Sequence, residues 1–166
     1  MNSILNEIED LNKRGFKEVI LLGQNVNSYC FKEGERVVDF AQLLDSCASQ
    51  FPKMRFRFST SNPQDMHDEV LHIVAKHHNV CKYIHLPVQS GSTRILKEMN
   101  RQHTREEYIE LVDRIYKIVP GISLSQDMIT GFPTEPEEDY QDTLSLMDYV
   151  RHDFGYMFAY SELPGP

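Results

Sequence analysis

The stretch His85-Leu-Pro-Val-Gln-Ser-Gly-Ser92 decides the predicted fold. The apolar segment 81–84 before it predicts a short buried strand, and the segment 92–99 after it predicts a helix with Ser92 as its N-cap. A strand that runs through a polar, glycine-containing turn into a helix is typical of ligand sites in parallel α/β proteins. Such a turn alone is more typical of a plain connecting loop. Recurrence of the pattern along the chain favours a ligand site.

Four further segments predict strands, and apolar residues at helical spacing separate them. These segments are residues 17–22, 54–59, 122–129 and 155–161. Strands that alternate with helices predict an α/β fold with a parallel sheet and right-handed crossovers. Asp39 predicts one helix start, and the segments 104–107 and 134–137 predict capping boxes at two others. The chain opens with a predicted helix, so we expect a strand upstream of it.

Composition bounds the class of protein. The chain has 166 residues, 40% of them hydrophobic, which predicts one domain with a substantial core. Its formal charge of −8 argues against nucleic-acid binding by this segment alone, because phosphate binding needs clustered Lys and Arg. No apolar run reaches the roughly 18 residues of a membrane span, and the first residues are acidic and amphipathic rather than a signal peptide. We therefore expect a cytoplasmic protein with no membrane partner.

The three cysteines do not form a metal motif. Cys30, Cys47 and Cys81 show no CxxC or CxxxCxxC spacing, so the sequence predicts no metal ligand among them. Cys47 falls on the apolar side of a predicted helix and Cys81 opens a strand, which predicts buried free thiols. The odd number of cysteines also disfavours a disulfide scaffold.

All the polar turns follow predicted strands, so in a parallel sheet they emerge at one edge. They are rich in Gln, Asn, Ser, Thr and Asp and poor in cations, which suits hydroxyls, amines and an adenine better than a phosphate cluster. Neither of the common glycine-rich phosphate-binding motifs is present. His85 is the histidine placed at this edge, although a lone histidine there is more often a hydrogen-bonded core residue than a catalyst.

Five segments, in order along the chain, carry a resemblance to one family. They are residues 22–29, 55–61, 85–92, 99–101 and 127–133, the last followed by Glu135. Together they closely resemble the tRNA methylthiotransferases, which are radical S-adenosylmethionine (SAM) enzymes. The resemblance implies an α/β fold, a partial parallel (β/α) barrel with five of the six strands of a (β/α)6 core. It also implies SAM at the C-terminal edge of the strands, and insertion of sulfur and a methyl group at C2 of an N6-modified adenosine next to the anticodon.

This sequence departs from the family where the CxxxCxxC motif that holds the radical-generating 4Fe–4S cluster should occur, in a loop after the first strand. We therefore expect residues 1–166 to be a single domain, a radical SAM core that lacks its first strand and cluster loop. The resemblance implies two 4Fe–4S clusters and tRNA as partner in the full-length protein. For the fragment we expect no cluster, no activity alone, and possible self-association through the exposed strand edge. The sequence does not identify the sulfur donor.

The resemblance also implies site residues. No catalytic side chain and no metal ligand is implied, because the cofactor carries the chemistry and the protein positions it. The pattern Gly-x-Ile-x-Gly-x-x-Glu is only partly kept: Asp127 replaces its first Gly and Thr134 occupies the Glu position, which leaves the role of Glu135 open. Arg101 is a candidate for contact with a substrate carboxylate or phosphate. The candidates for SAM binding are Gln24, Asn25, Ser59, His85, Gln89, Ser90, Asp127, Gly131 and Tyr160.

Two alternatives remain at this point. One is a sister enzyme that methylthiolates an aspartate of a ribosomal protein; the segment 23–27, Gly-Gln-Asn-Val-Asn, favours the tRNA branch. The other is a non-catalytic βα-barrel module that binds a metabolite or a protein. A CxxxCxxC motif encoded shortly upstream in the same gene would decide for the enzyme.

Overall fold

Five parallel strands follow one another across a curved sheet in the order in which they occur in the chain. The computed structural model describes residues 1–34, 36–59 and 62–162. β1 pairs with β4, and β5, β6 and β7 pair in that order. Backbone hydrogen bonds from Phe56 to Asn79 (2.8 Å) and from Cys81 to Phe56 (2.9 Å) join the two groups. These strands are β1 (Glu18–Leu21), β4 (Arg55–Phe58), β5 (Tyr83–His85), β6 (Ser123–Thr130) and β7 (Phe154–Ala159).

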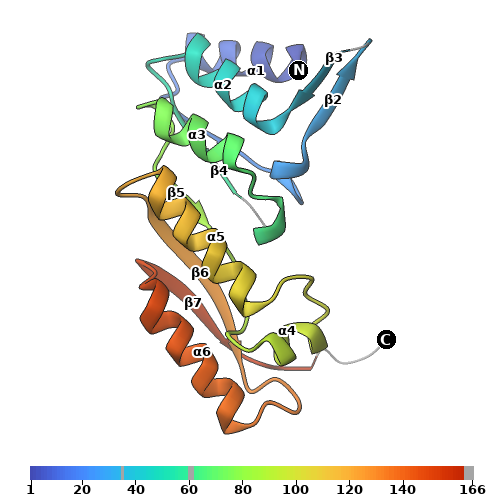
Figure 1. Ribbon diagram of the computed structural model, residues 1–166. Helices are drawn as coiled ribbons and strands as arrows, with labels where there is room; N and C mark the ends of the chain where they lie inside the picture. Colours follow the sequence, from blue (N-terminus) through green and yellow to red (C-terminus); the bar gives the residue numbers. More distant parts are fainter. Residues whose placement is uncertain (35, 60–61, 163–166) are drawn as a thin grey trace.

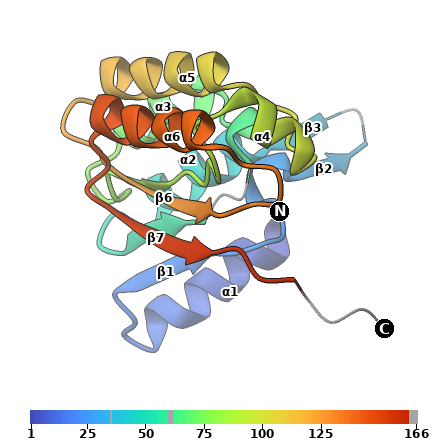
Figure 2. The same cartoon turned by 90° about the horizontal axis from the view of Figure 1, so that it is seen from below.

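The helices lie on the outer face of the sheet. Figures 1 and 2 show α5 and α6 packed against β5–β7, and Figure 2 shows α1 next to β1, at the other end of the curved sheet. The strand side chains that face the helices are fully or nearly fully buried, as Phe56, Ile84 and Leu124 are, and they form the core. The helices are α1 (Asn2–Lys13), α2 (Phe40–Gln50), α3 (Asp68–Lys76), α4 (Thr93–Glu98), α5 (Arg105–Ile118) and α6 (Glu137–Val150).

The five predicted strands and three of the predicted helix starts are confirmed, among them Ser92 as the N-cap of α4. Asp39 caps α2, accepting from the backbone N–H of Gln42 at 2.8 Å. The capping box of α5 is present, with Glu107 N donating to Thr104 Oγ1 at 3.2 Å and Thr104 N donating to Glu107 Oε2 at 2.8 Å. The α/β class and the partial parallel barrel are therefore correct. Within the described residues β1 has β4 as its one strand neighbour, and the sheet does not close.

Two local predictions are wrong. The predicted capping box at 134–137 does not form: α6 begins at Glu137 with Pro136 as N-cap and without a side-chain cap. A helix capped by Thr134 would need Glu135 in the helical region, which is disfavoured for a residue that precedes a proline. The sequence also did not predict the antiparallel hairpin of β2 (Cys30–Glu33) and β3 (Arg36–Asp39), which projects beyond α2 in Figure 1. Short exposed strands bury too little to leave an alternating pattern.

Two 3-10 turns lie beside the strand ends, η1 (Val26–Ser28) after β1 and η2 (Pro63–Asp65) after β4. None of the helices in the described part of the chain is long and apolar enough to cross a bilayer.

A half-buried histidine is expected to make the stability depend on pH. His152 lies between α6 and β7, and its Nε2 is 2.9 Å from the hydroxyl of Tyr108. Burial lowers the pKa of His152 from 6.5 to about 4. The unfolded chain therefore binds this proton at a higher pH than the folded chain does. The contribution of His152 to the free energy of unfolding should fall as the pH drops below about 6.5 and level off below about 4.

We expect this histidine to account for about 2 kcal/mol between pH 7 and pH 4, after allowance for its partial exposure. The measurement is urea unfolding of the wild type and His152→Gln across this range. The variant should show a flatter dependence on pH. His72 is exposed on α3, and His72→Gln is the matched control that should follow the wild type. Parallel curves for His152→Gln and the wild type would contradict the assignment.

Candidate functional site

The loops after β5 and β6 meet at the C-terminal edge of the sheet. Gln89 N donates to the carbonyl of Asp127 at 2.8 Å, and Ile129 N donates to the carbonyl of Gln89 at 2.9 Å. Gln89 has φ +77°, a left-handed conformation that residues other than glycine rarely adopt. Backbone strain of this kind clusters at functional sites. Two of the predicted site residues, Gln89 and Asp127, are thus adjacent.

A chain of polar side chains lines the inner face of the sheet below this edge. Ser125 Oγ lies 2.7 Å from the Tyr83 hydroxyl and 2.9 Å from His85 Nδ1. On the other side of the imidazole, His85 Nε2 lies 3.4 Å from Asp127 Oδ2. His85 and Asp127 retain 21% and 26% of their side-chain exposure, so both remain accessible from the inner face. The structure therefore brings these two predicted residues together.

Aromatic rings continue the inner face toward β7. Tyr156 pairs with Asp127 across the β6–β7 ladder, and its ring packs edge-on against His85 with centroids 6.5 Å apart. Beyond it, the predicted site residue Tyr160 packs edge-on against Phe132 at 5.2 Å, and its N–H donates to the carbonyl of Thr130 at 2.8 Å. An apolar ring beside polar groups suits a planar, polar-edged ligand such as a nucleobase.

The loop after β1 contributes Asn25, whose side-chain amide has an oxygen without a hydrogen-bond partner among the described residues. Asn25 Nδ2 donates to Asp65 Oδ2 in η2, which fixes the orientation of this side chain. Asn25 Oδ1 is buried and has no hydrogen-bond partner among the described residues. Because a buried unpaired acceptor is costly, this oxygen is suited to accept from a ligand ammonium or hydroxyl. Gln24 is exposed beside it, and the predicted site residue Ser59 at the end of β4 donates its N–H to the Leu21 carbonyl at 3.3 Å.

The loop after β6 explains Glu135. Gly131 has φ +74°, and its N–H donates to Glu135 Oε2 at 2.6 Å. The carboxylate therefore closes the turn of residues 131–135 rather than capping α6. Thr134, which occupies the Glu position of the family pattern, has φ +71°. Gly131 lies at the edge of the site, and its backbone N–H is already used.

Two predicted residues stand apart from this group. Ser90 is fully buried, and its Oγ accepts from Ser92 N at 3.1 Å and lies 3.4 Å from Thr143 Oγ1 on α6. Its hydroxyl thus faces the helix layer, which does not support the expected contact with a cofactor. Arg101 is exposed just after α4, and its N–H donates to the Leu96 carbonyl at 2.8 Å.

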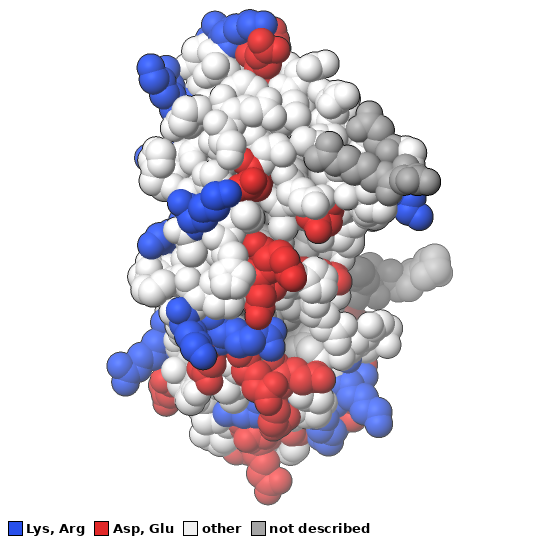
Figure 3. All heavy atoms as spheres, turned by 45° about the horizontal axis from the view of Figure 1, so that its top comes forward, with Lys and Arg blue, Asp and Glu red and all other residues white. Residues whose placement is uncertain are grey.

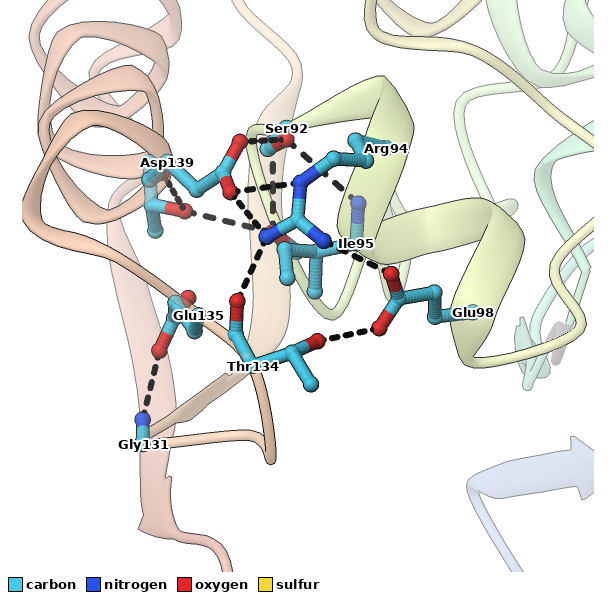
Figure 4. Close-up of polar contacts among 10 residues, drawn as sticks. Ser92, Arg94, Ile95, Glu98, Gly131, Thr134, Glu135 and Asp139 are labelled. Atoms are coloured by element: carbon cyan, nitrogen blue, oxygen red, sulfur yellow. Dashed lines mark hydrogen bonds and ion pairs between the residues drawn. The ribbon is translucent and has the colours of Figure 1, made fainter.

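Sequence reasoning missed an ion-pair network that spans the two loops, shown in Figure 4. Arg94 in α4 donates to Asp139 through Nε at 2.9 Å and also through Nη2. It further reaches Glu98 Oε1 at 2.6 Å and the Thr134 carbonyl at 2.7 Å. Ser92 Oγ donates to the second oxygen of Asp139 at 2.5 Å, and together with Arg94 it lowers the pKa of this carboxyl. Asp139 and Thr134 lie 45 and 40 residues from Arg94 in the sequence, so no local pattern predicts these contacts.

The match to a family model decides the family. Residues 1–147 match the model of the radical SAM superfamily. The chain belongs to the radical SAM superfamily. Enzymes of this superfamily use SAM together with a 4Fe–4S cluster.

Curated relatives narrow the comparison. The chain is 62% identical to a tRNA-2-methylthio-N(6)-dimethylallyladenosine synthase of Flavobacterium psychrophilum, over 98% of this chain and 37% of that protein. It is 55% identical to a protein of the same name from Bacteroides fragilis, over 99% of this chain and 36% of that protein. The chain therefore spans just over a third of the length of the curated relatives that it matches.

Solved structures show the same fold at low sequence identity. The radical SAM methyltransferase TsrM from Kitasatospora setae, solved with cobalamin and a 4Fe–4S cluster, aligns over 98% of this chain and 31% of its own, with a TM-score of 0.70 and 13% identity. Coproporphyrinogen III oxidase from Escherichia coli aligns over 75% of this chain and 29% of its own, with a TM-score of 0.59 and 19% identity. At these identities the likeness concerns the fold alone.

In the part of the chain that the structure describes, polar groups at the strand ends have the chemistry to bind SAM, and no set of cluster ligands is found. The unpaired Asn25 oxygen and the accessible pair His85 and Asp127 can take an ammonium and hydroxyl groups. Cys30 is exposed on β2 and Cys47 is buried in α2. Among the described residues no group of three or more His, Cys, Asp or Glu side chains could hold a metal ion. We therefore assign no cluster ligand in residues 1–34, 36–59 and 62–162.

Proposed function

We propose that this chain is the radical SAM core of a tRNA methylthiotransferase. In the whole protein it would act in the insertion of sulfur and a methyl group at C2 of an N6-dimethylallyladenosine of tRNA. The observation that carries the proposal is that Asn25, Gln89 and Asp127 all lie at the C-terminal ends of the parallel strands, with Gln89 and Asp127 hydrogen-bonded to each other, in a chain 62% identical to an enzyme of that name.

The net charge of this chain bears on which part of the full-length protein would bind tRNA. Figure 3 shows acidic and basic side chains interspersed over the face that it draws, and the net charge is −8. Such a surface attracts an RNA backbone poorly. We propose that another part of the full-length protein binds the tRNA backbone, and that this chain binds SAM and the reacting base. We also propose that the full-length protein is cytoplasmic, as tRNA is. Two 4Fe–4S clusters held outside this chain belong to the same proposal.

In this proposal the chain binds and orients. Bound SAM, with its cluster, supplies the radical chemistry and the methyl group. Asn25 Oδ1 would accept from the ammonium of SAM, and Gln89 and Asp127 would bind the ribose hydroxyls. His85 is held by Ser125 on one side and faces Asp127 on the other, so it can hold Asp127 in place.

The test is the variant Asp127→Asn in the full-length protein. It keeps the size of the side chain and removes the charge, and loss of one charged hydrogen bond should weaken SAM binding about tenfold. Equilibrium dialysis measures the affinity, 5′-deoxyadenosine formation measures cleavage, and iron content confirms that the clusters are intact. Asp148→Asn on the exposed face of α6 is the matched control.

Wild-type affinity in Asp127→Asn would remove this residue from the site. If the wild-type protein binds and cleaves SAM but leaves dimethylallyladenosine in tRNA unmodified, the proposed substrate is wrong. A ribosomal-protein aspartate would then be the next acceptor to assay. A full-length protein that does not bind SAM would overturn the proposal as a whole and favour a non-catalytic binding module.

A further inference from the structure

Arg94 joins the two loops that form the candidate site. It lies in the first turn of α4, directly after the loop of residues 86–92 that carries Gln89. Its guanidinium contacts the Thr134 carbonyl in the loop of residues 131–136 and Asp139 in the first turn of α6. Figure 4 shows this guanidinium in the space between the two loops. A single side chain therefore spans both loops.

The network closes on itself, so its members constrain one another. Glu98 accepts from Arg94 through one oxygen and from the Thr134 hydroxyl through the other. Asp139 likewise accepts from Arg94 through one oxygen and from Ser92 through the other. Arg94 is 45% exposed, where a single ion pair would stabilise little, but a planar fork with several fixed partners gives geometric control. A lysine could not reproduce it, because its ammonium is a single point charge.

Thr134 is the strained member. Its φ of +71° is unfavourable for any residue with a Cβ, and especially for a β-branched one. Both its carbonyl and its hydroxyl are held, by Arg94 and Glu98. The same turn contains Gly131, whose N–H is bound by Glu135. The contacts of Arg94 and Glu98 with Thr134, called the Arg94 clamp below, therefore maintain a turn conformation that is unfavourable for an isolated chain.

We propose that Arg94 is a positioning residue of the SAM site: it holds Thr134 in its left-handed conformation and thereby locks the loop after β6 against the loop after β5. This proposal rests on the proposed function for the identity of the ligand, and on the contacts alone for the locking. Arg94 touches neither the inner face nor the polar chain of His85, so its effect on binding passes through the loops.

The experiment combines Arg94→Gln with Thr134→Gly. Glycine adopts a positive φ without strain, so it should remove the need for the clamp. Amide hydrogen exchange of Gly131, Phe132, residue 134 and Glu135 and SAM affinity are measured in the full-length protein for both single variants and the double variant. Arg114→Gln is the control, because Arg114 makes a comparable exposed ion pair with Asp68 at 3.4 Å, away from both loops.

In Arg94→Gln we expect exchange of these amides to rise about tenfold and SAM affinity to fall about tenfold, the ratio that corresponds to ~1.4 kcal/mol. Thr134→Gly alone should bind SAM like the wild type. In the double variant SAM affinity should return to within about threefold of the wild type, a rescue that general destabilisation would not give. The control should leave both measurements unchanged.

Unchanged exchange in Arg94→Gln would overturn the locking. A loss of affinity that Thr134→Gly does not restore would overturn Thr134 as the point of action, and with it the proposal. If the wild type itself does not bind SAM, the proposed function fails, and the exchange measurement still decides whether Arg94 locks the loops.

Discussion

Replacing Gly91 with alanine is expected to lower the free energy of unfolding by about 3 kcal/mol, as severe overpacking does. A Cβ on Gly91 would lie 2.5 Å from the Cα of Thr143 and 2.6 Å from the carbonyl oxygen of Asp142. Both are backbone atoms of α6, so no side-chain rotation can relieve the contact. Gly91 N–H also donates to Thr143 Oγ1 at 2.9 Å, a bond that any shift of α6 would break.

Chemical unfolding measures this loss, and Gly23→Ala is the matched control. A Cβ at Gly23 would meet its nearest neighbour, Val26, at 3.6 Å, an ordinary contact. The control should change the stability by less than about 0.5 kcal/mol. Equal stability of the two variants would contradict the close approach of α6 to the loop of residues 86–92.

The change Tyr108→Phe is expected to cost about 2–3 kcal/mol, or about 5–10 °C in melting temperature. The Tyr108 hydroxyl donates to the Leu86 carbonyl at 3.0 Å and lies 2.9 Å from His152 Nε2. Because its one proton is used by Leu86, His152 must be the donor in the second bond. Removal of the hydroxyl leaves the buried Leu86 carbonyl and the half-buried His152 Nε2 without this partner, which costs more than the net value of the bonds themselves.

Differential scanning calorimetry of Tyr108→Phe tests this, with Tyr149→Phe for comparison. Tyr149 is 54% exposed and its hydroxyl bonds Asp113 at 3.0 Å, where water can replace the lost partner. The comparison variant should melt close to the wild type. Similar melting temperatures for both variants would show that the Tyr108 hydroxyl is not the link between the β5 loop and the α6–β7 connection.

The fold could be predicted because burial on the helix side leaves a strong local pattern. Ile84 and Leu124 are buried on the side of their strands that faces the helices. The start of α5 is marked in the sequence by a capping box, which forms as predicted. The start of α6 could not be predicted in the same way. The segment 134–137 matches a capping box, but Pro136 disfavours the helical conformation of the preceding residue, and the helix begins at Glu137.

The site was predictable as a set of loops but not as a set of contacts. Alternation on β5 and β6 places His85 and Asp127 on one face, which the register confirms. Ser90 lies in the same kind of loop and yet faces α6, because the loop turns after Gln89 in its left-handed conformation. The Arg94 clamp depends on distances between elements, which spacing along one element does not encode.

Strand order equal to chain order has a consequence for biosynthesis. Each new strand from β4 to β7 is added at the edge that its predecessor has just exposed, and its helix closes over the same junction. No strand has to wait for a later one to be inserted between itself and its neighbour. The sheet can therefore grow one βα unit at a time as the chain leaves the ribosome, which limits the lifetime of unpaired edges during synthesis.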